Sequence, residues 1–178
     1  GRKNLGIHSA FISDSIIDLI DNGMINGKEK SMHKGLIIAS YCMGTKRLYD
    51  RIDKNPMFSF HPMEYVSDPA ILSKNKKFVS ITQAHAVDLT GQVCSDRFNG
   101  ELSGGISAQP DFIRGAALSS EGRPIICLAS TTDDGKQSGI LPFFSEGDGI
   151  TLAGSDVHYV VTEFGTAFLF GKSITEKA

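Results

Sequence analysis

The chain has 178 residues, of which 40% are apolar and 21% charged, and its formal net charge is −2. This composition is typical of a folded globular protein, and the length allows one domain with its own apolar core. The near-neutral charge argues against a strong positive field, so we expect neither a nucleic acid nor an acidic membrane as partner.

No apolar run approaches the roughly 20 residues that span a bilayer, and no signal peptide is recognisable. The cysteines Cys42, Cys94 and Cys127 are scattered and form no C-x-x-C pair. This pattern predicts buried, reduced thiols in a cytoplasmic protein. The five histidines show no metal-ligand spacing, so we expect no metal site.

Residues 1–77 are predicted to alternate between helix and strand. Ser13 can cap the first helix, in which isoleucine and leucine alternate with aspartate at helical spacing. The continuous apolar run GLIIASYCM predicts a strand that is buried on both faces. We expect helices over about 14–21, 46–53 and from 69 onward, and strands over 35–43 and 58–61.

Residues 78–178 are predicted to be mostly strands around one helix, which Pro110 and Asp111 open. Ser173, with Glu176 three residues later, predicts the start of another helix. Because that helix would stop after one turn, we expect the chain to be a domain cut from a longer protein. We expect strands over 78–89, 92–95, 124–129, 140–144, 150–152 and 159–162, and a helix over 110–118.

Short helices between buried apolar strands indicate an α/β fold, with an open, mostly parallel sheet and flanking helices in one domain. Such sheets bind ligands beyond the carboxyl ends of their strands. We therefore look for a site among the loop residues that follow the apolar runs.

Two segments are specific enough to suggest chemistry. The first is LGIHSAFISD, residues 5–14. Within it the Ser9 hydroxyl has no identifiable base, and Asp14 is best explained as a first-turn helix residue. The second is SGGISAQPDFIRGA, residues 103–116, whose glycines allow close approach of the backbone and offer N–H groups to an anion. An ordinary surface turn is the competing interpretation of this loop.

Together with MGTKRLYD at 43–50, VDLTGQV at 87–93 and DVHYVVTEFG at 156–165, these segments resemble the acetyl-CoA hydrolase/transferase family. That family includes 4-hydroxybutyrate CoA-transferase. Order and spacing match from Leu5 to the end of the chain. The resemblance implies a CoA-transferase fold of the NagB/RpiA-like type, and it implies that this chain is the C-terminal half of such a protein.

The family pattern G-[IV]-H-[ST]-E-x-x-S-D contains a glutamate, just after a strand, that attacks the acyl-CoA thioester. The attack forms an acyl-glutamyl anhydride and releases CoA thiolate, which then forms a glutamyl-CoA thioester. Here Ala10 stands at the glutamate position and has no nucleophilic atom. Glu163, in the T-E-[YF]-G turn, is expected to have a structural role and not to replace the nucleophile.

The family's glycine loop, S-G-x-G-G-Q, offers backbone N–H groups as an oxyanion hole. In this chain two of the glycines are replaced by Ser107 and Ala108, whose Cβ atoms crowd the approach. The resemblance assigns this loop to Gly104, Gly105, Ser107, Ala108 and Gln109. Further CoA or acyl contacts are expected from Ser9, Phe112, Arg114 and Lys46. For Lys46, in the basic turn at 43–50, we favour a structural role over a contact with CoA phosphates.

The resemblance implies a short-chain acyl-CoA as substrate or ligand and no metal or redox cofactor. The implied partners are the N-terminal half of the same parent chain and a second copy in a homo-oligomer, in the cytoplasm. Two functions remain open. One is an acyl-CoA transferase or hydrolase with altered chemistry. The other, which the residues favour, is a non-catalytic CoA-binding or regulatory domain, fused in some relatives to an N-acetyltransferase.

Overall fold

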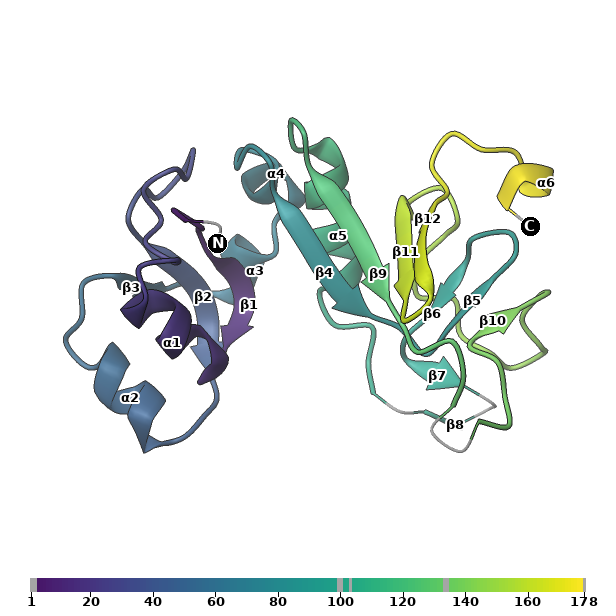
Figure 1. Ribbon diagram of the computed structural model, residues 1–178, viewed down its shortest axis with the longest axis horizontal. Helices are drawn as coiled ribbons and strands as arrows, with labels where there is room; N and C mark the ends of the chain where they lie inside the picture. Colours follow the sequence, from purple (N-terminus) through teal and green to yellow (C-terminus); the bar gives the residue numbers. More distant parts are fainter. Residues whose placement is uncertain (1–2, 99–100, 103, 133–134, 178) are drawn as a thin grey trace. The chain divides into compact units, whose positions relative to one another are not determined.

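The computed structural model describes residues 3–98, 101–102, 104–132 and 135–177. The chain divides into two compact units, residues 1–76 and residues 77–178, and each is described here by itself (Figure 1). Strand pairing is mostly parallel and helices flank the strands in both units, which confirms the predicted α/β class.

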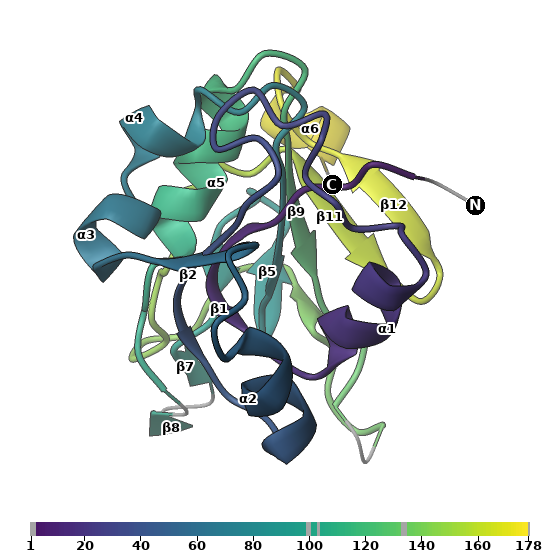
Figure 2. The ribbon, with the colours of Figure 1, turned by 90° about the vertical axis from the view of Figure 1, so that its left-hand side faces the viewer.

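The first unit is a three-stranded parallel sheet in the order β1-β2-β3. Figure 2 faces this unit, with α1 and α3 on opposite sides of β1 and β2. Both predicted strands and all the predicted helices of this part are present. The elements are β1 His8–Ile12, α1 Ser15–Asp21, β2 Ile37–Cys42, α2 Lys46–Ile52, β3 Phe58–Phe60, α3 Met63–Val66 and α4 Pro69–Leu72.

Strand β1 is the main difference from the sequence-based expectation. The family glutamate was expected just after a strand, whereas position 10 lies inside β1. The buried run is also shorter than predicted, because β2 is buried over Ile37–Ala39 and has Tyr41 exposed. Tyr41 instead stacks on the exposed ring of Phe11 in the neighbouring strand, with ring centroids 5.7 Å apart.

The core of the first unit joins α1 to the sheet. Its buried members are Ile12, Ile20, Ile25, Ile37 and Ala39. Full burial of an isoleucine side chain stabilises a fold by about 1.5–3 kcal/mol. Helix α1 contributes Ile20 to this cluster, and Ile16 packs against it, so the helical spacing of the isoleucines faces the sheet.

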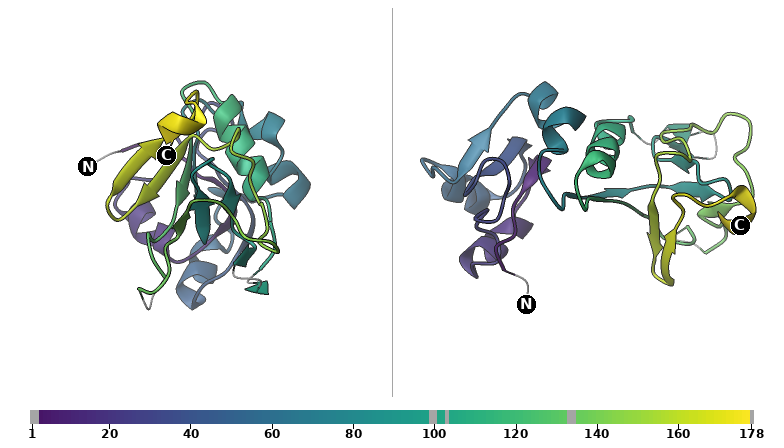
Figure 3. Two further views of the ribbon diagram at one scale, coloured as in Figure 1. Left: turned by 90° about the vertical axis from the view of Figure 1, so that its right-hand side faces the viewer. Right: turned by 90° about the horizontal axis from the view of Figure 1, so that it is seen from above.

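The second unit contains a four-stranded sheet in the order β12-β11-β9-β4, and a smaller one in the order β10-β5-β6. Figure 3 shows β11 and β12 as a hairpin at one edge of the larger sheet. The elements are β4 Val79–Gln83, β5 Ala86–Asp88, β6 Val93–Cys94, β7 Arg97–Phe98, β8 Glu101–Leu102, α5 Gln109–Leu118, β9 Arg123–Cys127, β10 Ile140–Leu141, β11 Tyr159–Thr162, β12 Gly165–Phe168 and α6 Ile174–Lys177.

The second unit differs from the sequence prediction in several details. The strand expected over 78–89 is divided into β4 and β5, which belong to different sheets. The strand expected over 150–152 is reduced to an isolated bridge between Val93 and Leu152. The short antiparallel pair of β7 with β8 was not among the predicted strands.

Helix α5 packs on β4 and β9 and contributes Ile113 to the core of the second unit. The strands contribute Ile126 and Val160 to the same core. At the end of the chain, the predicted helix start is confirmed, because the backbone N–H and hydroxyl of Ser173 both donate to the Glu176 carboxylate at 2.8 Å.

The three cysteines are free, and only Cys94 is fully buried, whereas Cys42 and Cys127 are half-buried. Burial raises the pKa of the Cys94 thiol. Among the helices that the structure describes, none has the length and apolarity needed to cross a membrane.

Candidate functional site

Ala10 lies in the middle of β1. On either side of it, Ser9 pairs with Ala39 of β2 and Phe11 pairs with Tyr41 of β2. The residue is half-buried. Its methyl group offers no atom that could attack a thioester carbonyl. Ser9, predicted as a possible acyl-CoA contact, is held in the same strand.

Asp14, the nearest carboxylate in the sequence, is engaged elsewhere. Its side chain accepts hydrogen bonds from the Thr45 hydroxyl at 2.7 Å and from the Thr45 backbone N–H at 2.8 Å. These bonds hold the pKa of Asp14 below its usual value, and the carboxylate thereby fixes the start of α2. Ser13 was predicted to cap α1, but the N-cap residue is Asp14 and no side chain caps that helix.

The basic turn at the start of α2 is neutralised by carboxylates. Lys46 lies 2.6 Å from Asp50, one helical turn away, and Arg47 lies 2.6 Å from Asp18 of α1. Asp18 raises the pKa of the Arg47 guanidinium. This arrangement favours the structural interpretation of the turn.

Two buried basic side chains, His8 at the start of β1 and Lys30 in the loop before β2, form hydrogen bonds to backbone carbonyls near β1. The His8 ring bonds through Nε2 to the Val66 carbonyl at 2.9 Å, and burial lowers the pKa of His8 to about 4. The Lys30 ammonium donates to the carbonyls of Ile7 and Leu36, both at 2.9 Å, and burial lowers the pKa of Lys30 to about 8.

Lys30 was missed by sequence reasoning. It lies in the polar run KEKSMHK, which resembles an ordinary solvated loop, yet the side chain is only 9% exposed. An added Cβ at Gly6 would collide with its stem, so the glycine of the first motif makes room for Lys30. The lysine thus joins the loop before β2 to the residue that precedes β1.

In the second unit, the predicted glycine loop leads into α5. Gly104, Gly105 and Ser107 are exposed, and Ala108 is buried as the N-cap residue of α5. Ser107 has a φ of 54°, which is left-handed backbone that glycine adopts much more readily than serine. The serine therefore occupies a conformation for which a glycine is better suited. Ser103 lies outside the described residues.

Gln109 joins the loop to the sheet. Its side-chain amide donates to the Thr82 hydroxyl at 2.9 Å and to the Gln83 carbonyl at 3.0 Å. Both acceptors belong to the carboxyl end of β4. The amide N–H groups are thus used to hold α5 against the sheet, and we assign Gln109 a positioning role in the loop.

The other predicted contacts on α5 already have partners. The Phe112 ring lies 6.3 Å from that of Phe78. The Arg114 guanidinium is 3.1 Å from the Asp156 carboxylate. Ser9, Ala10 and Lys46 belong to the first unit, whereas the loop, Phe112 and Arg114 lie together on and before α5 of the second.

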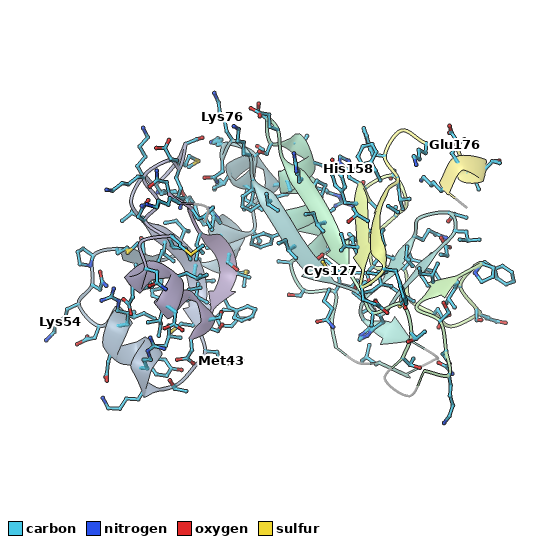
Figure 4. All side chains as sticks on the ribbon, viewed as in Figure 1. Met43, Lys54, Lys76, Cys127, His158 and Glu176 are labelled. Carbon is cyan, nitrogen blue, oxygen red and sulfur yellow. The ribbon has the colours of Figure 1, made fainter. Side chains whose placement is uncertain are left out.

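A cavity of about 330 Å³ opens at the carboxyl ends of the neighbouring strands β4 and β9. Cys127, labelled in Figure 4, is the last residue of β9 and directly precedes the segment that forms one wall. This position agrees with the expectation that ligands bind beyond strand ends. The described residues that line the cavity are Gln83, Ala84, His85, Ala129, Thr131, Thr132 and Gly139.

Glu163 fixes the wall of this cavity. Its carboxylate accepts hydrogen bonds from the Ser130 backbone N–H, at 3.0 Å, and from the Ser130 hydroxyl, at 2.5 Å. These bonds lower the pKa of Glu163, so the group is a poor base and a good acceptor. The predicted structural role of Glu163 agrees with this geometry. The partner, Ser130, was not predicted.

A family model described as the acetyl-CoA hydrolase/transferase C-terminal domain matches residues 44–178. The chain is 45% identical to the 4-hydroxybutyrate coenzyme A transferase of Clostridium kluyveri. It is 40% identical to the succinyl-CoA:cyclohexane-1-carboxylate CoA transferase of Geobacter metallireducens. Each alignment includes 99% of this chain and 41% or 40% of the relative, respectively. The chain therefore spans about two fifths of the length of these curated relatives.

Two solved structures have the same fold. RipA from Yersinia pestis matches with a TM-score of 0.87 and 34% identity, over 99% of this chain and 38% of that chain. A 4-hydroxybutyrate CoA-transferase from Porphyromonas gingivalis matches with a TM-score of 0.83 and 35% identity, over 99% and 40%. These matches confirm the predicted CoA-transferase fold.

Proposed function

Because the chain belongs to the acetyl-CoA hydrolase/transferase family, we propose that it is the C-terminal, acyl-CoA-binding half of a CoA-transferase-type protein that has lost the family's covalent step. The ligand is CoA or a short-chain acyl-CoA, and the N-terminal half of the same parent completes the site. The parent assembles as a homo-oligomer in the cytoplasm.

The observation that carries this proposal is the environment of residue 10. Covalent transfer through a carboxylate requires that carboxylate, because the intermediate is its own acyl derivative. Ala10 provides none, and the Asp14 side chain already accepts two hydrogen bonds from Thr45. The loop before α5 supports the same conclusion, since Ser107 and Ala108 add side-chain atoms where the family has glycine.

The second candidate is an active transferase or hydrolase in which another group performs the chemistry. The identity of 45% to a 4-hydroxybutyrate coenzyme A transferase favours it, because the rest of the chain is close to that relative. The two candidates differ in one observable, which is turnover of acyl-CoA by the full-length parent.

The test is acyl-CoA exchange by the purified parent, with acetyl-CoA and isotope-labelled acetate, followed by mass spectrometry of the thioester. We expect binding of acyl-CoA without exchange. Clear turnover would overturn the proposal and favour the second candidate.

A pair of variants separates the two changes in the site. Ala10→Glu alone should give little exchange, because the loop residues remain altered. Ala10→Glu combined with Ser107→Gly and Ala108→Gly should give more. Robust exchange by Ala10→Glu alone would show that residue 10 is the single lesion.

A further inference from the structure

Residues 27–36, between α1 and β2, form a closed loop that polar contacts attach to the rest of the first unit. Its ends meet where the Gly35 N–H donates to the Gly27 carbonyl at 2.9 Å. The apolar side chains of the loop, Met32 and Leu36, are half-buried, and neither belongs to the apolar core of the unit. Segments with few buried apolar contacts are those that open locally at the lowest free energy.

His33 attaches this loop to α3. Its Nε2 forms a hydrogen bond with the Tyr65 hydroxyl at 2.7 Å. The ring of His61, the residue after β3, stacks on the Tyr65 ring with centroids 4.8 Å apart and lies 6.0 Å from the His33 ring. His61 is held in turn by the Ser59 hydroxyl, 2.9 Å from its Nε2. The φ of His33 is 51°, a left-handed conformation that costs about 1–2 kcal/mol, and the contacts of the ring offset this cost.

The ionisable groups around the His33 ring are bases, apart from the Tyr65 hydroxyl of α3. The loop itself contributes Lys30, β1 contributes His8, and the end of β3 contributes His61. Lys30 carries a positive charge at pH 7, because its pKa of about 8 lies above that value. Burial lowers the pKa of His33, and the charges of Lys30 and His61 lower it further.

No carboxylate neutralises this group of bases. Among the described residues, none forms an ion pair with Lys30, His33 or His61. The acids that adjoin the cluster in the sequence, Glu29 and Glu64, are exposed. A proton on either histidine therefore adds a positive charge that nothing nearby compensates.

We propose that the loop 27–36 is an acid-sensitive latch, in which protonation of His33 and His61 places two positive charges side by side, next to Lys30, and releases the loop from α3. Protonated His33 can still donate to the Tyr65 hydroxyl, so the loop opens through repulsion and not through loss of that bond. Opening transfers the charges to water and separates them, which relieves both the desolvation and the repulsion.

The direction of the pH effect follows from proton binding. In the opened loop His33 is hydrated and titrates near 6.5, whereas in the closed loop its pKa is lower. The opened state therefore binds more protons, and opening becomes more favourable as pH falls below 6.5. The closed loop is fully favoured above that value.

Opening of the latch also acts on the two strands next to it. The Lys30 ammonium leaves the carbonyls of Ile7 and Leu36, to which it donates at 2.9 Å in the closed loop. Ile7 directly precedes β1 and Leu36 directly precedes β2. The latch therefore couples acid to the strand that carries position 10.

The test is hydrogen exchange of the full-length parent at pH 7.5 and pH 5.0, followed by mass spectrometry and corrected for the intrinsic effect of pH. Peptides over residues 27–36 report on the latch, and peptides over α5 are the internal control. We expect protection of the loop to fall at least about tenfold and that of α5 to stay constant, because each histidine that gains a proton on opening contributes up to about tenfold per pH unit. Both pH values lie above the pKa of His8, about 4, so unfolding driven by His8 does not interfere.

The deciding variant is the double substitution His33→Gln and His61→Gln, which keeps polar side chains that do not titrate. It should abolish the effect of pH on the loop, and each single substitution should reduce it and guard against misfolding of the double variant. The matched control is His158→Gln in the second unit, where burial also lowers the pKa of the histidine. This control should leave the response of the loop unchanged.

Three results would overturn the latch: constant protection of the loop down to pH 5.0, an equal loss of protection in the variants that lack His33 or His61, or a parallel loss in α5. The last would mean that acid unfolds the whole protein and not this loop. Because the assay contains no acyl-CoA, its result does not depend on the proposed function.

Discussion

Ser107 shows how a single substitution can alter a loop without changing its course. Its φ of 54° places an L side chain in a conformation that costs about 1–2 kcal/mol relative to right-handed backbone. The loop keeps this conformation because Ala108 and Gln109, which follow directly, are fixed by burial and by hydrogen bonds to β4.

We expect Ser107→Gly to stabilise the fold by about 0.5–1 kcal/mol, since relief of the left-handed backbone exceeds the added entropy of glycine in the unfolded chain. Urea denaturation measures this difference. Ser107→Ala retains the Cβ and should give no gain. Equal or lower stability of the glycine variant would show that Ser107 is not strained.

His8 makes the stability of the first unit depend on pH. Histidine titrates near 6.5 in an unfolded chain, whereas burial, with the charge of Lys30, lowers the pKa of His8 to about 4. Between these values the unfolded state binds more protons, so acid favours unfolding. Neutral His8 makes its full contribution to the free energy of unfolding above pH 6.5, and this contribution is lost as pH falls through about 4.

The full loss corresponds to about 3 kcal/mol. Denaturation at a series of pH values should show this decline, and His8→Gln should flatten it. Should that variant fail to fold, the His8 ring signals of the native protein can be followed by NMR. They should stay unshifted above pH 5, and an ordinary titration near 6.5 would contradict the prediction.

At the scale of elements, the division between β4 and β5 shows what periodicity misses. The run FVSITQAHAVDL is apolar enough for one long strand. The backbone changes partner within it, because Ala84 N–H donates to Cys127 of β9 and His85 N–H donates to Cys94 of β6. Such a change depends on strands far along the chain, so the sequence pattern could not predict it.

Some residues of the candidate site could be predicted from local sequence motifs, and others could not. Motif spacing led directly to position 10, to the loop before α5 and to Glu163. Lys30, Ser130 and the two acceptors of Gln109 are recognisable only once residues 23 to 33 positions apart meet in space. Local patterns therefore identified the segments of the site, and tertiary contacts defined its walls.

Helix α5 depends on Gln109 for its attachment to β4. Gln109→Leu removes the amide that donates to the Thr82 hydroxyl and to the Gln83 carbonyl. We therefore expect a loss of about 1–2 kcal/mol in the free energy of unfolding. Thr82→Val removes one acceptor only and should cost less. Thermal or urea denaturation of both variants measures the effect. A neutral Gln109→Leu would show that packing alone holds the helix.

At the scale of the whole molecule, several arginines are paired with aspartates and the formal charges nearly cancel. Arg47, Arg51 and Arg114 lie within 2.6–3.1 Å of aspartate oxygens, and the net charge of the chain is −2. The chain therefore lacks the strong positive field that would draw in a polyanion over long distances. Attraction between exposed charges is, in addition, screened by salt.

It follows that CoA binding by this chain should depend only weakly on salt. We expect the Kd to change by less than about threefold between 50 and 500 mM NaCl, because a chain with a net charge of −2 has no strong positive field for salt to screen. Calorimetry at the two concentrations measures this ratio. A loss of affinity of tenfold or more would place the main contacts at the CoA phosphates.

The placement of the three free cysteines provides a ready-made probe of the molecule in solution. Cys42 and Cys127 are half-buried, one in each compact unit, while Cys94 is fully buried with a raised thiol pKa. Brief treatment with a maleimide spin label should therefore modify the first two and spare the third. The native sequence thus allows a dipolar distance between the units to be measured in the presence and absence of ligand, without an engineered attachment site.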